Sequence, residues 1–207
     1  MNAIVLQPRI SGTTVTTGKC RASYVHVFEP QPDRNPKPGA KPKHSISLLV
    51  PKTDKATIQM LQEAIKQAGT DKFGPKFIEQ ARAGRMRMGI RDGDKERADD
   101  PAYVGHYFVN CRSNNKPIVL ARDAVTQITN PADFRSGDYC RATINAFAYD
   151  NEGNKGVSFG LIHLQKVESG EPLGAVGPAP STVYDAIPGD ETPPNGSSAG
   201  GDDDFPV

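Results

Sequence analysis

Aromatic and basic side chains alternate with small apolar ones along residues 138–149, DYCRATINAFAY. Successive side chains of a β-strand point to opposite faces of the sheet. One face would be apolar and meet the core, with Cys140, Ala142, Ile144, Ala146 and Ala148. The other would carry Tyr139, Arg141, Thr143, Asn145, Phe147 and Tyr149. Rings stack on unpaired bases and cations follow the backbone, so this face predicts a platform for a single strand, unless a helix or another chain covers it.

Two basic loops could add contacts to phosphates. Residues 30–43 hold five prolines together with Arg34, Lys37, Lys41 and Lys43, which is typical of an extended basic arm. Residues 82–97 contain six arginines or lysines among glycines, including Arg85 and Arg87. The alternative for both segments is an ordinary solvated surface loop.

Further candidate contacts lie on other predicted strands. Tyr24, His26 and Phe28 alternate on one strand, and Tyr103 and Tyr107 alternate on another. We predict that the remaining nucleic-acid contacts come from Arg21, Tyr24, Tyr107, Arg112 and Lys155. Sequence alone does not decide which face of each strand points outward.

Positive and negative charges are separated along the chain. All 25 lysines and arginines lie at or before Lys166, whereas eight of the 24 acidic residues follow it. The body therefore carries a net charge of about +9 and the tail about −8, although the whole chain is only +1. A basic body beside an acidic tail indicates a polyanionic partner for the body. The tail would mask that surface, dock on partners or serve solubility alone.

The segment from Gly170 onward is rich in Gly, Pro, Ser and Asp and offers little to bury, so we expect a disordered tail over 170–207 after a folded domain over 1–169. Near its end, acidic residues precede an aromatic ring. These residues form a predicted docking motif for a partner protein: Asp202, Asp203, Asp204 and Phe205.

Catalysis is the main competing hypothesis. Clustered carboxylates could hold Mg²⁺ for a nuclease: Asp92, Asp94, Glu96, Asp99 and Asp100. They lie among basic residues in a Gly-containing polar segment, which favours a solvated turn. The four histidines are scattered, and no nucleophile motif is evident. We therefore predict a protein that is not an enzyme and that needs no cofactor and no metal.

The remaining pattern predicts a mainly β protein. Strands are expected at 13–28, 44–50, 103–112, 117–121, 138–149 and 156–167, with 113–117 and 150–156 as hairpin turns. Apolar spacing predicts a helix over 53–69, capped by Thr53 and Gly69, and a shorter one over 75–83 that packs Phe77 and Ile78 inward. Short strands with one long helix favour a Greek-key barrel of the OB class.

Neither a membrane span nor a secretory signal is present in this sequence, and three widely spaced cysteines argue against a disulfide framework. We therefore expect a cytoplasmic protein.

Two blocks and the acidic, Phe-containing terminus together resemble a known family. The blocks are YFVNCRSNNKPIVLARD and FRSGDYCRATINAFAYDNEGNKGVSFGLIHLQKVESGEPLG. The family is that of phage single-stranded-DNA-binding proteins, with an OB barrel related to the replication protein of a short-tailed coliphage. The likeness covers most of residues 1–175 in layout. It implies single-strand binding in replication, recombination or repair and recruitment of replication proteins (a polymerase, helicase or primase) through the tail. It would place 138–149 in the DNA-facing sheet and Asp202–Phe205 in the docking tail, although two residues follow Phe205.

A strand-annealing mediator and an RNA-binding regulator remain alternatives, because either could use the same surface. Whether the chain forms a homodimer stays open.

Overall fold

The computed structural model describes residues 6–33, 36, 39–151 and 153–174. Its strands are β1 (Arg9–Ser11), β2 (Thr14–Thr16), β3 (Cys20–Gln31), β4 (Lys43–Pro51), β5 (Ile90–Asp92), β6 (His106–Ser113), β7 (Ile118–Leu120), β8 (Tyr139–Asn151) and β9 (Asn154–Glu168). Its helices are α1 (Lys55–Phe73), α2 (Phe77–Arg82), α3 (Gly93–Glu96) and a 3-10 turn, η1 (Pro131–Asp133). The described part of the chain contains no helix long and apolar enough to cross a membrane.

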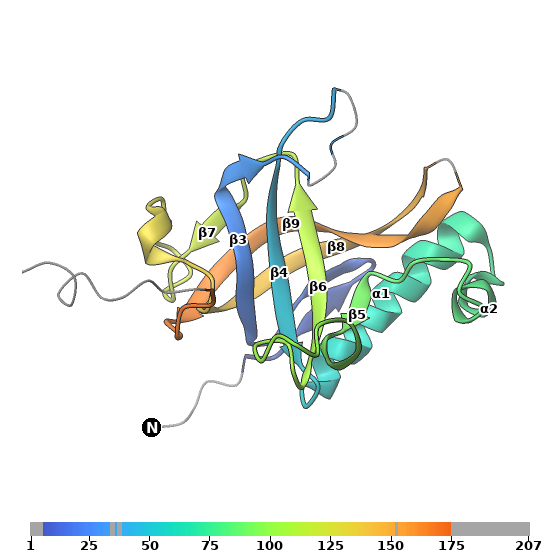
Figure 1. Cartoon of the computed structure of the whole chain (residues 1–207), viewed down its shortest axis with the longest axis horizontal. Helices are drawn as coiled ribbons and strands as arrows, with labels where there is room; N and C mark the ends of the chain where they lie inside the picture. Colours follow the sequence, from blue (N-terminus) through green and yellow to red (C-terminus); the bar gives the residue numbers. More distant parts are fainter. Residues whose placement is uncertain (1–5, 34–35, 37–38, 152, 175–207) are drawn as a thin grey trace, which may run out of the picture. The chain divides into compact units, whose positions relative to one another are not determined.

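Five strands close into a ring in the order β3-β4-β6-β9-β8 (Figure 1). Neighbours in the ring are antiparallel except β6 and β9, which run parallel. The β8–β9 pair is the longest, from Tyr139↔Glu168 to Asn151↔Asn154, and its turn confirms the predicted hairpin at 150–156. One parallel pair in an otherwise antiparallel five-stranded ring is an OB-type Greek-key barrel, as the sequence predicted.

The predicted hairpin across 113–117 is wrong. β6 and β7 do not pair with each other, because each runs parallel to β9, through Cys111↔Phe159 and Ile118↔His163 respectively. The turn residues in this segment redirect the chain rather than reverse it. The strand expected over 103–112 begins only at His106, and Tyr103 lies in a turn.

Both predicted helices exist, but their ends differ from the prediction. Asp54, not Thr53, caps α1 by accepting a hydrogen bond from Thr57 N. The helix continues past Gly69 to Phe73 and is followed by Gly74, whose φ of 81° suits a chain reversal. A Cβ on Gly69 would stand 2.2 Å from the Phe77 ring, so this glycine serves the close approach of α2. Phe77 is buried as predicted, whereas Ile78 is only half-buried.

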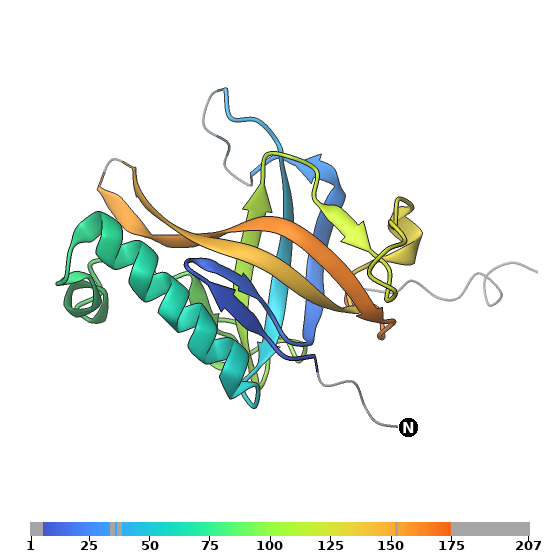
Figure 2. The same cartoon turned by 180° about the vertical axis from the view of Figure 1, so that it is seen from behind.

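The face assignment for 138–149 is confirmed. Cys140, Ala142, Ile144 and Ala146 are buried in the main core, and Ala148 packs against it. Helix α1 lies along the β8–β9 pair, where Lys72 Nζ donates to Ala148 O at 3.3 Å (Figure 2). The three cysteines are buried and free, and burial raises the pKa of Cys20 to about 12. They act as small core side chains.

A buried carboxylate ties the ends of β8 and β9 together. Asp138 is 1 % exposed and forms an ion pair with Lys166 at 3.1 Å. It also accepts hydrogen bonds from the backbone N–H groups of Arg135 and Gly170. Residues 170–174 continue along the barrel, where Leu173 N donates to Ser136 O. The predicted boundary at 169 stays a prediction, and the tail from 175 lies outside the described residues.

We expect Asp138→Ala to lower the free energy of unfolding by about 2–4 kcal/mol, because it leaves two backbone donors without their acceptor and removes the carboxylate beside the Lys166 ammonium, which keeps only Asp133 O. Urea unfolding measures the loss. Glu168→Ala is the matched control, since its pair with Lys19 is exposed (51 % and 42 %) and should contribute no more than about 1 kcal/mol. Equal losses in the two variants would contradict this role for Asp138.

Candidate nucleic-acid interface

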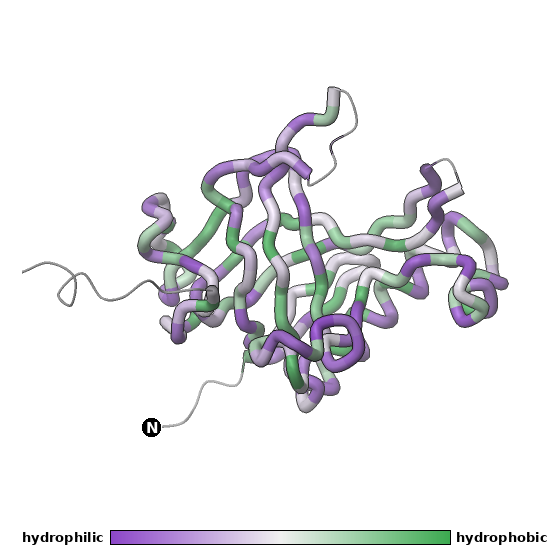
Figure 3. Tube along the Cα trace, viewed as in Figure 1, coloured by the Kyte–Doolittle hydropathy of each residue, from purple (hydrophilic) through white to green (hydrophobic). Residues whose placement is uncertain are grey.

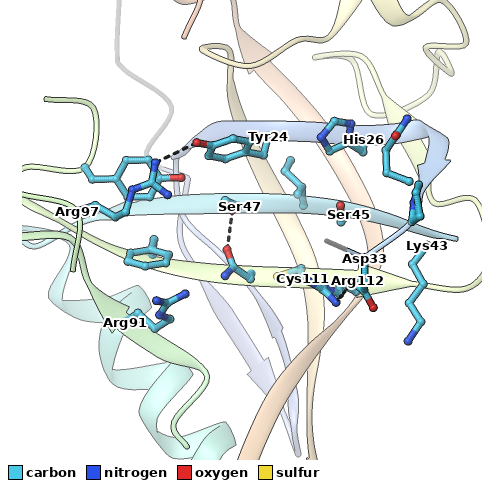
Figure 4. A pocket seen from close by; sticks show the side chains of 16 residues that line it. Tyr24, His26, Asp33, Lys43, Ser45, Ser47, Arg91, Arg97, Cys111 and Arg112 are labelled. Atoms are coloured by element: carbon cyan, nitrogen blue, oxygen red, sulfur yellow. Dashed lines mark hydrogen bonds and ion pairs between the residues drawn. The ribbon is translucent and has the colours of Figure 1, made fainter. Parts of the chain in front are cut away.

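A groove runs across the outer face of β3, β4 and β6. Its hollow measures about 340 Å³. Tyr24 and His26 of β3 form one wall, and Ser45 and Ser47 of β4 form the floor (Figure 4). Ser47 donates to Asn110 Oδ1 of β6 at 2.6 Å. The groove therefore combines rings with hydroxyl and amide groups over three neighbouring strands.

Four cations line this groove, two at each end. Arg91 and Arg97 lie at one end, and Lys43 and Arg112 lie at the other (Figure 4). Buried rings support the first end, because Arg97 stands 4.6 Å from the Tyr103 ring centre and Arg91 stands 4.7 Å from that of Phe108. Tyr103 and Phe108 contact each other edge-on at 5.1 Å.

A second hollow of about 550 Å³ adjoins the first. The two share Lys43 and Arg112, which stand where β4 and β6 meet the barrel rim. The outer face of β8 supplies much of the second hollow, with Asn145, Phe147, Tyr149 and Asn151. Phe147 is 44 % exposed. In OB barrels the face of the second and third strands, which are β4 and β6 here, and the loops at its rim are where oligonucleotides bind.

Carboxylates partner three of the groove arginines. Arg91 pairs with Glu96 at 2.5 Å, Arg97 pairs with Asp100 at 3.1 Å, and Arg112 pairs with Asp33. All three pairs are at least one-third exposed at one or both partners. Such pairs contribute little to stability, so a phosphate can replace the carboxylate beside Arg91 or Arg112 at small cost. Arg97 differs, because the nitrogen that meets Asp100 also donates to Tyr24 Oη.

Basic side chains form ion pairs with the carboxylates of the nuclease hypothesis. Lys52 Nζ lies 2.5 Å from Asp92 and 2.7 Å from Asp94. Its hydrogen bond keeps the pKa of the Asp94 carboxyl below the ordinary value. The segment around α3 is strongly hydrophilic (Figure 3). Within the described residues, no group of three or more His, Cys, Asp or Glu is placed to hold a metal ion.

Five of the predicted contact residues meet in the two hollows: Tyr24, Lys43, Arg112, Phe147 and Tyr149. They come from four strands and from positions up to 125 residues apart, so their convergence follows from the ring. Their contact with a nucleic acid stays a prediction.

Four others lie outside both hollows and contact the protein itself. Arg141 donates to Gln7 O at 2.7 Å and to Thr17 O at 3.0 Å, and burial lowers its pKa. Arg21 donates to Gly137 O and Glu171 O. Tyr139 is flanked by the cations of Lys19 and Arg21, and Tyr107 by Lys52. The first half of the β8 face is thus contacted by Gln7, Thr17, Lys19 and Arg21. Only its second half lines a hollow.

The residues of the predicted basic loops also include some that line a hollow and some that do not. Residues 82–97 are not one loop, because they include β5 and α3. Arg85 and Arg87 are exposed but line neither hollow, and Lys155 pairs with Asp150 at 3.0 Å. In the proline-rich arm Lys41 is exposed, whereas Arg34 and Lys37 lie outside the described residues. The docking motif Asp202–Phe205 also lies outside them.

Sequence reasoning did not single out Arg91, Arg97 and Asn110 as contacts, although all three line the first hollow. Arg91 and Arg97 belong to the basic segment that it noted. They stand among acidic residues in the sequence, which hid their positive charge. The rings that support them, Tyr103 and Phe108, come later in the chain.

An OB-type barrel with an aromatic and basic groove across its sheet defines a protein of the oligonucleotide-binding class. Comparison with known proteins names the family. Residues 13–191 match the family model described as "Enterobacter phage Enc34, ssDNA-binding protein". The chain therefore belongs to this phage family.

Individual relatives agree. Protein p50 of Acyrthosiphon pisum secondary endosymbiont phage 1 is 29 % identical over 149 residues, covering 70 % of this chain and 79 % of that one. The single-stranded DNA-binding protein of bacteriophage Enc34, solved with ssDNA, is similar with a TM-score of 0.66 at 22 % identity, over 84 % of this chain and all of that one. The bacteriophage T7 protein gp2.5 is similar with a TM-score of 0.55 at 14 % identity, over 82 % and 100 %. At these identities the two structures show the shared fold.

We expect Arg141→Ala to lower the free energy of unfolding by about 1–3 kcal/mol, because it removes two hydrogen bonds from a charged donor to backbone carbonyls. Arg112→Ala breaks only an exposed ion pair and should cost at most about 1 kcal/mol. Urea unfolding of the two variants compares them. If Arg112→Ala were the less stable variant, the structural role given to Arg141 would be wrong.

Proposed function

We propose that this protein binds single-stranded DNA along the two adjoining hollows. The observation that carries the proposal is their continuity through Lys43 and Arg112, with exposed rings on both sides of this junction. Tyr24 borders the first hollow and Phe147 and Tyr149 border the second. Cations would hold the phosphates while these rings stack on bases.

Several features favour an unpaired strand over a duplex. The rings lie in hollows of a sheet rather than on a protruding helix, and stacking requires bases with free faces. The family membership and the ssDNA-bound relative support the same choice. Asn110 and Asn145 line the hollows and offer amide groups to base edges.

We further propose that binding serves phage DNA replication, recombination or repair in the cytoplasm of the bacterial host. The acidic tail would recruit replication proteins, since three aspartates and a phenylalanine suit a pocket rimmed by basic residues. Binding alone, without catalysis, meets this role.

Binding to oligothymidine tests the proposal. The wild-type affinity should fall steeply with salt, with a log–log slope of roughly −0.7 per phosphate neutralised. Phe147→Ala should weaken binding by about 1–3 kcal/mol, because one stacking ring is lost. Fluorescence anisotropy measures both.

Ile118→Ala is the matched control, because Ile118 of β7 is exposed to a similar extent (41 %) but lies outside both hollows. It should bind as the wild type does. A wild-type protein that fails to bind oligothymidine at low salt would overturn the proposal. Loss of affinity in Phe147→Ala accompanied by an equal loss of stability would assign Phe147 to packing instead.

The proposed role of the tail predicts that partner binding can be lost while DNA binding is kept. Deleting residues 175–207 should abolish retention of the phage polymerase, helicase or primase on immobilised protein, because the acidic docking motif is gone. Phe205→Ala should weaken retention, and replacing all three aspartates by asparagine should do the same. Oligothymidine binding, measured in parallel, should persist in every variant. Undiminished retention by the deletion variant would reject recruitment through the tail.

A further inference from the structure

Tyr24 has an unusual backbone conformation for its residue type. Its φ is 47°, and Ala124 is the only other non-glycine residue with a positive φ in the described chain. Left-handed φ crowds the Cβ of a bulky residue. The conformation falls where the β3–β4 register shifts between Ser23 and His26. It leaves the ring 47 % exposed at the groove wall. Strained residues of this kind persist only where their surroundings hold them, and they gather at functional sites.

Arg97 holds the end of this ring. Its Nη2 donates to Tyr24 Oη at 2.9 Å and to Asp100 Oδ2 at 3.1 Å. Its guanidinium also rests over the Tyr103 ring, 4.6 Å from the ring centre. Tyr103 is 1 % exposed. Arg97 is therefore fixed by a carboxylate and by a buried ring.

The contacts form a closed circuit. Tyr103 Oη donates to Ser23 Oγ at 3.2 Å, and Ser23 precedes Tyr24 in the chain. Tyr103 thus holds the side chain of the residue before Tyr24, and it also supports the arginine that holds the Tyr24 hydroxyl. On the other side of Tyr24, Val25 N donates to Ser136 Oγ at 3.1 Å. The neighbours of Tyr24 and the tip of its exposed ring are therefore all restrained.

We propose that Arg97 is a positioning residue, which fixes the Tyr24 ring as a preformed stacking surface for one unpaired base. Its charge is balanced by Asp100, and the same nitrogen serves Tyr24 and Asp100. It acts through the tyrosine and does not hold a phosphate. The inference rests on the proposed function and adds to it the residue that orders the first ring. A ring already held in place loses less freedom on binding, which raises affinity.

A double-mutant cycle tests the circuit in the full-length protein with oligothymidine. Tyr24→Phe keeps the ring and removes one oxygen, and Arg97→Gln removes the charge. Each should weaken binding roughly 3–10-fold, the range expected for releasing one restrained side chain. The double variant should be no weaker than the poorer single variant, because both changes break the same contact. Multiplicative losses would overturn the proposal.

Salt dependence separates positioning from phosphate contact. Arg97→Gln should keep the wild-type log–log slope while its affinity falls. A slope reduced by about 0.7 would mean that Arg97 neutralises a phosphate, which overturns the proposal. Arg112→Gln provides the contrast, since Arg112 stands at the junction of the hollows and should show a shallower slope.

A spectroscopic readout tests stacking at this position, because the chain has no tryptophan. Oligothymidine should quench the fluorescence of Tyr24→Trp, whereas Val104→Trp, exposed outside both hollows, should stay unquenched. Equal signals would overturn the stacking role. If the wild-type protein binds oligothymidine but the two substitutions act independently, only this inference is rejected. If the wild-type protein does not bind, the proposed function is rejected. Urea midpoints confirm that each variant is folded.

Discussion

Closure of the ring by β8 and β9 is the constraint on which the rest of the structure depends. β8 pairs with β3 on one side, and β9 pairs with β6 on the other. Once these pairings exist, the outward face of every strand is set, because a one-residue slip would exchange the two faces. Lys43 of β4 and Tyr149 of β8 then line one hollow, although they are more than 100 residues apart. Asp138 and Lys166 hold the two strands at the far end of this pair.

Small side chains make up part of the barrel core. The strands turn small side chains inward, including Cys20, Cys140 and Ala142, each almost fully buried. Burial raises the pKa values of the thiols, so they stay protonated and behave as apolar spacers. Phe77, Phe134 and Phe159 are also buried in the main core. Tyr103 and Phe108 form a second, smaller cluster, and these two rings support the groove arginines.

The sequence predicted what is local and missed what depends on distant pairing. Alternation in 138–149 identified the faces of β8, since a single strand carries the whole signal. The same reasoning could not see that the N-terminal segment covers the half around Arg141. Alternation of Tyr24, His26 and Phe28 breaks at the register shift, and only Tyr24 and His26 line the groove. The hairpin at 113–117 was wrong because its strands pair with β9, about 45 residues further on.

Carboxylates partner three of the four cations that line the groove. Arg91, Arg97 and Arg112 each meet a carboxylate, so a net positive charge of about +9 is combined with local pairing in the site itself. Pairing fixes the guanidinium groups before any ligand arrives, and exposed pairs are weak enough to exchange one anion for another. Long-range attraction can then come from the body as a whole, while the groove provides geometry. An unpaired arginine would attract a phosphate equally well but would have to be ordered on binding, and ordering lowers affinity.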